Sequence, residues 1–193
     1  MESHVMKRCA LLLSLSALAL SSAQIAVADE WGTNTKNTGA HPDGGIHGYC
    51  YSASVSEDLK SGIREAEWSA LHNGTDTEVN YDSTCKYSGS GETDVVWFQT
   101  NLPYGKRGTT FCEDFDGSHC DQFYIDIDLA EINVGSYDEY DEAKTTCHEL
   151  GHSVGLTHGS TYGGCMVSGE VPGTSVQYRR YSPHHVWHIN NWF

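Results

Sequence analysis

The sequence predicts an α+β domain with a twisted mixed sheet, a helix that follows the sheet and a small C-terminal subdomain. Apolar residues recur at helical spacing over residues 56–72, and a second helical pattern covers about 137–154. Short segments with strand-like alternation lie between these two patterns. The chain has 193 residues, a length that favours one compact domain.

The first 28 residues have the features of a secretory signal peptide. Lys7 and Arg8 give a basic start, residues 9–23 are almost wholly apolar or small, and Ala26-Val27-Ala28 offers a small-x-small cleavage site. The apolar run is shorter than the ~20 residues that a membrane span needs. We therefore expect a secreted, extracellular protein that is cleaved after Ala28 or, as the alternative, after Ala23.

The mature domain is expected to cover residues 29–193. Residues 29–45 are rich in Gly, Asn, Thr, Asp and Pro, and this composition predicts an irregular segment. A first strand is expected over residues 46–55, and the helix over 56–72 follows it. Asn73-Gly74 ends this helix, and its N-cap is either Ser54 with Glu57 or Ser56 alone.

Three further strands are expected before the second helix. The last of them alternates well, with the apolar residues on one side and the acidic residues on the other, which are Phe123, Ile125, Ile127 and Leu129 against Asp126 and Asp128. The segment 102–122 contains Pro103 and several glycines and is expected to form a loop. The expected strands cover residues 78–81, 95–100 and 123–132.

The second helix has clear boundary signals. Ser136 with Glu139 has the spacing of a capping box, and acidic residues occupy the first turns, where the helix dipole favours them. A helix from about Tyr137 to Val154 is therefore expected, and Gly155 closes it. Ser182-Pro183 starts a final short helix.

Six cysteines remain once Cys9 is removed with the signal peptide. An even number of cysteines in an exported chain indicates disulfides, because the compartment is oxidising. Six cysteines allow 15 connectivities. Chain order suggests the simplest three pairs, which are Cys50–Cys85, Cys112–Cys120 and Cys147–Cys165.

The composition is strongly acidic. The net charge is −15, and it becomes −16 without residues 1–28, because 25 acidic residues then face 9 basic ones. An acidic surface repels phosphate backbones and anionic lipids, so we expect neither nucleic-acid nor membrane partners. The acidic residues between Glu113 and Asp128 either bind Ca²⁺ or form a solvated acidic face; they lack EF-hand spacing.

The strongest chemical signal is the segment His148-Glu149-x-x-His152-x-x-Gly155-x-x-His158. Residues four apart on a helix face the same way, so His148 and His152 can bind one metal ion. Glu149 is one position round the helix, near the metal and well placed to take a proton from a bound water. These residues favour one catalytic Zn²⁺ with Glu149 as the catalytic base.

Gly155 explains how His158 can become the third metal ligand. If the helix continued, His158 would lie ~9 Å beyond His152 and ~240° round the axis. A glycine can adopt a left-handed conformation that reverses the chain and returns His158 to the site. Three histidines leave a fourth position of a tetrahedral zinc open for water, which is typical of catalytic rather than structural sites.

With this motif and Met166, the chain resembles the metzincin zinc metalloproteases. Met166 lies eight residues after His158 and is the only methionine beyond the first 28 residues. The resemblance implies a metzincin-like zincin domain whose active-site helix carries the motif. It also implies an upper part to about residue 155, a lower part over 156–193, and a Met-turn in which Met166 forms a floor beneath the zinc ligands.

The size and the secretion signal are most similar to those of the small bacterial metzincins, the matrixin-like and snapalysin-like enzymes. Two positions depart from related patterns. Snapalysin-type enzymes have Asp as the third ligand, where this chain has His158, and Ser168 stands where some metzincins place a metal-binding tyrosine.

The resemblance implies a zinc endopeptidase that acts on protein or peptide substrates, and we expect it to be a secreted monomer. A zinc amidase acting on cell-wall peptides and a non-catalytic, disulfide-rich zinc-binding module are the alternatives. Tyr162, Tyr178 and Tyr181 are candidates for stabilising the oxyanion. His184 and His188 are spaced i, i+4, and they form either a second metal site or ordinary surface or core histidines.

Overall fold

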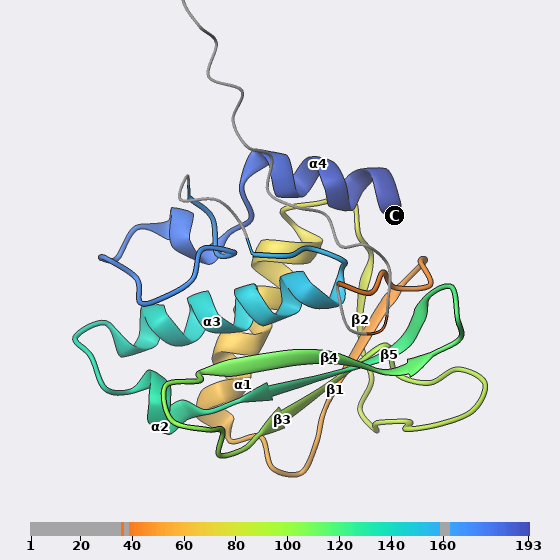
Figure 1. Ribbon diagram of the computed structural model, residues 1–193, viewed down its shortest axis with the longest axis horizontal. Helices are drawn as coiled ribbons and strands as arrows, with labels where there is room; N and C mark the ends of the chain where they lie inside the picture. Colours follow the sequence, from red (N-terminus) through yellow and green to blue (C-terminus); the bar gives the residue numbers. More distant parts are fainter. Residues whose placement is uncertain (1–35, 37–38, 159–162) are drawn as a thin grey trace, which may run out of the picture.

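The computed structural model describes residue 36, residues 39–158 and residues 163–193. The predicted signal peptide lies outside the described residues. Within the part of the chain that is described, no helix is long and apolar enough to cross a membrane. The fold is α+β, as predicted, and its centre is a five-stranded mixed sheet with helices packed on it (Figure 1).

The sheet has the strand order β2-β1-β3-β5-β4. All neighbours are parallel except β4 and β5, which form an antiparallel pair at one edge. On β5, Phe123, Ile125 and Ile127 are buried, which confirms the predicted alternation. The strands are β1 (His47–Tyr51), β2 (Val79–Tyr81), β3 (Val95–Gln99), β4 (Gly108–Phe115) and β5 (Cys120–Ile127).

Strand β4 was not predicted, because its residues belong to the segment 102–122 that was expected to form a loop. Its pairing with β5 has register shifts between Cys112 and Phe115, so no simple alternation marks it in the sequence. The predicted strand over 123–132 is also too long. Asp128 accepts hydrogen bonds from the backbone N–H groups of Ala130 and Glu131, and this cap starts the short helix α2 (Leu129–Ile132).

The predicted first helix is present, and it starts where Ser56 caps it. The side chain of Ser56 accepts a hydrogen bond from Leu59 N. Helix α1 (Glu57–Arg64) continues directly into η1 (Glu65–His72), which has π-helical hydrogen bonding. The wider π-helical turn was not predicted, because helical apolar spacing does not distinguish the two forms.

Helix α3 (Asp138–Ser153) matches the predicted second helix, but its cap differs. The Ser136–Glu139 capping box does not form; the N-cap is Tyr137, which makes no side-chain cap hydrogen bond. Asp138 instead accepts from Gly135 N at 3.1 Å, so the first-turn carboxylate satisfies the backbone that leads into the helix.

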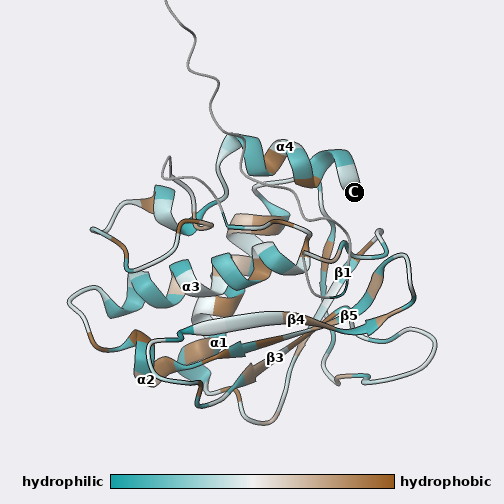
Figure 2. Cartoon of the chain, in the orientation of Figure 1, coloured by the Kyte–Doolittle hydropathy of each residue, from teal (hydrophilic) through white to brown (hydrophobic). Residues whose placement is uncertain are grey.

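Helices α1 and α3 lie on the same side of the sheet, and the C-terminal segment lies beyond α3 (Figure 1). This segment contains η2 (Val176–Arg179) and α4 (Pro183–Trp192), whose predicted start at Pro183 has a capping box formed by Ser182 and His185. Hydrophobic residues gather along the inner strands and on the helix faces that meet them (Figure 2). Helix α3 is therefore enclosed by the sheet and the C-terminal segment.

All six cysteines are paired as chain order suggested. The three disulfides are Cys50–Cys85, Cys112–Cys120 and Cys147–Cys165. The second closes the β4–β5 hairpin. The third joins α3 to the segment before Met166 and thereby ties the helix to the C-terminal part of the chain.

Candidate active site

The three predicted histidine ligands lie together at the C-terminal end of α3. The ring centres of His148 and His152 are 4.9 Å apart, and His158 lies 5.1 Å from each of them. One ligand nitrogen from each ring falls within 4.8 Å of the others. This spacing allows the three side chains to bind one metal ion.

Hydrogen bonds fix how two of these rings present their nitrogens. His148 Nδ1 lies 2.9 Å from Cys165 O, and His152 Nδ1 lies 2.8 Å from Leu156 O. A carbonyl oxygen can only accept, so each Nδ1 carries the proton and each Nε2 keeps a lone pair for a metal. Burial also lowers the pKa of both histidines, which favours the neutral imidazole that a metal requires.

The chain reversal after α3 follows the mechanism expected for Gly155. Its φ is 91°, in the left-handed region that favours glycine. Leu156 N donates to Gly151 O at 2.9 Å and closes the turn. The backbone then leads back across the helix end, so that His158 reaches the other two rings.

The side chain of Glu149 extends from α3 toward the edge strand β4. Thr110 Oγ1 lies 2.8 Å from Glu149 Oε2 and also 2.8 Å from the Glu149 carbonyl oxygen. Burial raises the pKa of the Glu149 carboxyl to about 7, and the hydroxyl of Thr110 opposes part of this rise. A carboxyl group with a pKa near neutrality can both accept and return a proton.

Two glycines make room for the site. A Cβ atom on Gly108 of β4 would lie 2.6 Å from Glu149 Cγ, so a larger residue at this strand position would displace the Glu149 side chain. A Cβ atom on Gly151 would collide with Met166 Sδ and lie 3.2 Å from Tyr181 Cε1. Met166 is fully buried. It packs against α3 at Gly151, in the part of the helix that carries His148 and His152.

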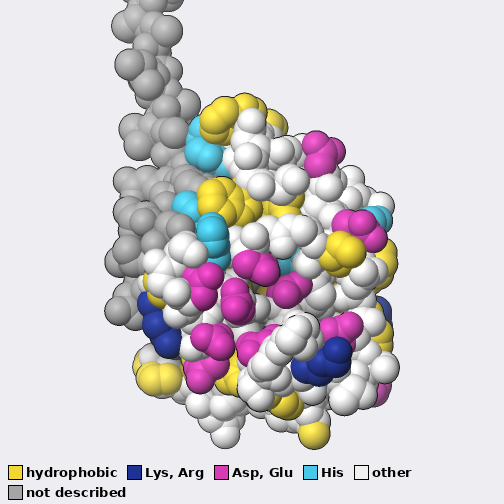
Figure 3. Space-filling view, turned by 90° about the vertical axis from the view of Figure 1, so that its right-hand side faces the viewer, with side chains coloured by type: hydrophobic (Ala, Val, Ile, Leu, Met, Phe, Trp, Pro, Cys, Tyr) yellow, Lys and Arg dark blue, Asp and Glu magenta, His cyan; other side chains and the backbone are white. Residues whose placement is uncertain are grey.

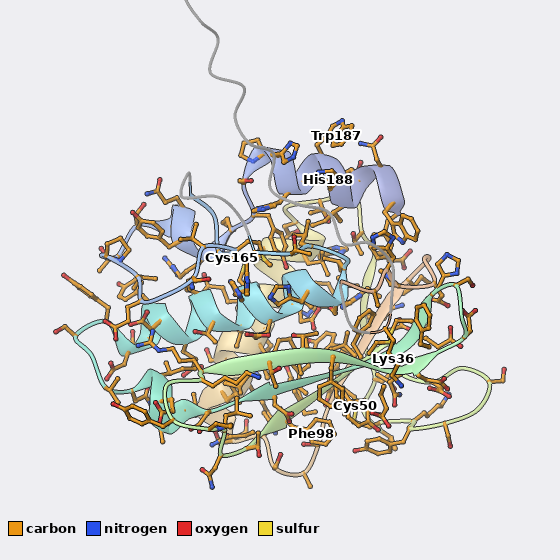
Figure 4. The ribbon with its side chains drawn as sticks, in the orientation of Figure 1. Lys36, Cys50, Phe98, Cys165, Trp187 and His188 are labelled. Atoms are coloured by element: carbon orange, nitrogen blue, oxygen red, sulfur yellow. A yellow bond between two sulfur atoms is a disulfide. The ribbon has the colours of Figure 1, made fainter. Side chains whose placement is uncertain are left out.

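The predicted oxyanion candidates have different surroundings. Tyr181 is buried, and its hydroxyl donates to Cys147 O at 3.2 Å, so it supports the backbone of α3. Tyr178 lines a pocket beside the site. Tyr162 lies outside the described residues. Cys165, labelled in Figure 4, lies over α3. Its backbone carbonyl orients His148, and its side chain forms the disulfide with Cys147.

The histidine site opens into a cleft of about 510 Å³. One wall comes from the loop before β4 and from Gly108, and the opposite wall comes from α3 and the segment after Met166. Three basic side chains line it, which are Lys106, Arg107 and Lys144. The roles of Thr110, Gly108 and these basic residues were not predicted from the sequence, because only the tertiary fold brings them to the motif.

The other predicted metal ligands do not join this site. Among the described residues, the histidine trio is the one group of three or more such side chains that converges on a single point. Asp128 caps α2, and Asp116 accepts hydrogen bonds from Ser118 and His119 within its own turn. Calcium binding stays a prediction. His184 and His188 on α4 place their Nε2 atoms 3.0 Å apart.

Comparison with solved structures finds chains of similar fold. No protein-family model matches the sequence. No curated protein matches it either. The chain is similar in structure to archaemetzincin from Methanopyrus kandleri, with a TM-score of 0.46 and 15% sequence identity over 78% of this chain and 97% of the other. At this level of similarity, the functional interpretation depends on the residues of the histidine site.

Proposed function

We propose that this chain is a secreted zinc-dependent endopeptidase with a metzincin-like catalytic domain over residues 29–193. The convergence of three histidine nitrogens beside the buried Glu149 carboxyl is the observation that carries the proposal. The donor set fits zinc, because neutral imidazoles held by backbone carbonyls are preferred zinc ligands. Met166, packed beneath the ligand-bearing turn, fits the predicted Met-turn.

The residues of the site have separate roles in the proposed hydrolysis. When bound, zinc polarises the substrate carbonyl and lowers the pKa of a water molecule. His148, His152 and His158 hold the ion. Glu149 accepts the proton of the attacking water and returns it to the leaving amine, and the Thr110 hydroxyl keeps its carboxylate in place.

An extended peptide fits the surroundings of the site better than a compact amide. Strand β4 lies at one edge of the sheet, and its first residue, Gly108, lines the cleft. A peptide can add to such an edge through main-chain hydrogen bonds, which places its backbone along the cleft. This feature favours a peptidase over the amidase alternative.

The setting of the enzyme belongs to the same proposal. Three disulfides in a chain of this size are typical of exported proteins, and they support secretion directed by residues 1–28. We place the boundary between the upper and lower parts at about residue 155. We further propose a monomer of the small bacterial, matrixin-like or snapalysin-like type.

The proposal is tested by zinc content and casein cleavage of purified protein. Wild type should contain one zinc per chain and cleave casein, and a chelator should abolish the cleavage. Glu149→Gln should retain zinc and lose cleavage, whereas Glu139→Gln, an exposed position on the same helix, should remain active. Zinc without any turnover would favour the binding module, and turnover restricted to cell-wall peptides would favour the amidase.

A further inference from the structure

Lys144 lies one helical turn before His148 and therefore on the same face of α3. Lys144 as a whole residue is only 6% exposed, and Nζ donates a hydrogen bond to Gly169 O at 2.8 Å. Lys144 lines the active-site cleft and also an adjoining pocket of about 290 Å³. The ammonium group is thus placed at the junction of the two cavities.

Within the described part of the chain, no carboxylate pairs with this ammonium at close range. Among the described residues, no Asp or Glu oxygen lies within 4 Å of Lys144 Nζ. Arg107 holds two acidic groups of this region: it contacts Asp141 Oδ1 at 3.6 Å and pairs with Glu170. Asp141 also accepts from Val171 N at 2.7 Å. A buried charge with one carbonyl partner is unfavourable unless a ligand supplies the opposite charge.

The distribution of charge over the molecule makes this cluster unusual. Of the 11 Lys and Arg residues, Lys7 and Arg8 belong to the predicted signal peptide, which leaves 9. Three of these 9 line the active-site cleft. Elsewhere the surface is acidic, and Asp and Glu side chains gather on the face shown in Figure 3. Glu149 and Glu170 also line the cleft, so its lining carries one more basic than acidic side chain in a protein of net charge −15, and this local excess favours an anionic ligand.

The pocket itself fits a side chain with an aliphatic stem and an anionic end. Its walls include the apolar side chains of Val167, Val171, Pro172 and Tyr178, and Lys144 contributes its cation. Ser168 and Glu170 line both cavities, so a substrate in the cleft can extend one side chain into the pocket. The Glu170 carboxylate is turned toward Arg107 by their ion pair.

We propose that Lys144 is a specificity-determining residue that selects peptide substrates with an acidic side chain next to the cleaved bond. This inference rests on the proposed peptidase function. The carboxylate of a substrate Glu or Asp enters the pocket and receives hydrogen bonds from the Lys144 ammonium, while its stem contacts the apolar walls. Lys144 then pairs with the substrate and keeps its bond to Gly169.

The test compares quenched-fluorescence peptides that differ at one position beside the cleaved bond. Glu, Gln and Lys are placed there in turn, first on one side of the bond and then on the other. On one of the two sides, wild type should cleave the Glu peptide with a kcat/KM about 10- to 100-fold above the Gln peptide, the effect expected of a charge-assisted hydrogen bond. The Lys peptide should be the poorest, and added salt should reduce the Glu preference.

Lys144→Met should bring the Glu and Gln peptides to within about 2-fold of each other, since the variant lacks the charge-assisted bond. Lys144→Arg should keep much of the preference. The matched control is Lys86→Met, which removes an exposed charge remote from the cleft and should behave as wild type. If Lys144 only supports the loop at Gly169, Lys144→Met will slow both peptides equally and leave their ratio unchanged, which overturns the proposal.

A binding measurement separates this inference from the proposed function. Fluorescence anisotropy of the same peptides with the Glu149→Gln protein should show tighter binding of the Glu peptide than of the Gln peptide. Equal binding, or equal cleavage by wild type, refutes the role of Lys144. If wild type cleaves no peptide at all, the peptidase proposal fails, and the binding comparison still decides whether Lys144 selects an acidic side chain.

Discussion

Gly151→Ala tests the packing of Met166 beneath the zinc ligands. Alanine is about 1 kcal/mol better than glycine in a helix interior, so an unobstructed site would be stabilised. Here the new Cβ would collide with Met166 Sδ and lie 3.0 Å from Met166 Cε and 3.2 Å from Tyr181 Cε1. Overpacking of a buried site costs about 1–3 kcal/mol. We therefore expect a net loss of up to about 2 kcal/mol in the free energy of unfolding.

A double-mutant cycle identifies the cause of this loss. Met166→Ala alone should cost about 2–5 kcal/mol, because it opens a cavity. In that background the collision is gone, and Gly151→Ala should become stabilising by up to about 1 kcal/mol. Urea unfolding with a chelator present measures all four proteins without the contribution of zinc. A Gly151→Ala protein that is more stable than wild type with Met166 present would refute the packing described for this helix turn.

Three further predictions concern other contacts. Thr110→Val should retain zinc but lower kcat about 10-fold with little change in KM, since it removes the hydroxyl that holds Glu149, and Thr110→Ser should restore activity; unchanged kcat would exclude this role. Burial raises the pKa of Glu67 from 4.5 to about 8, so the folded protein keeps a proton that the unfolded chain loses. The free energy of unfolding of the wild-type protein should therefore fall by about 1 kcal/mol from pH 7 to 8. Thermal unfolding of Glu67→Gln across that range should not show this fall; a variant with the pH dependence of wild type would contradict the raised pKa. Replacing Cys147 and Cys165 by Ser should lower the free energy of unfolding by about 3 kcal/mol for a loop of 18 residues and speed zinc loss to a chelator; wild-type zinc retention would argue against this bond as a support of the site.

The histidine site was predictable because its determinants are local. The i, i+4 spacing of His148 and His152 fixes their common face, and the conformational freedom of Gly155 permits the turn that returns His158. The α+β class followed from equally local patterns of apolar residues. Each of these features depends on the geometry of a single helix or turn.

The parts that escaped prediction depend on contacts between distant segments. Thr110 is separated from Glu149 by 39 residues, and it meets that carboxylate only because β4 pairs with β5 at the edge of the sheet. The Ser136–Glu139 capping box has the right spacing but does not form, because the helix begins one residue later, with Tyr137 as its N-cap. Local spacing therefore identifies the ligands, whereas the tertiary fold determines what surrounds them.

X-ray absorption spectroscopy at the zinc edge tests the central claim most directly. The wild-type protein should show one zinc per chain with three imidazole nitrogens at about 2.0–2.1 Å and one further oxygen ligand. His158→Ala should lose one imidazole contribution and bind zinc more weakly. Sulfur in the coordination shell, or a spectrum that His158→Ala leaves unchanged, would contradict the three-histidine zinc centre.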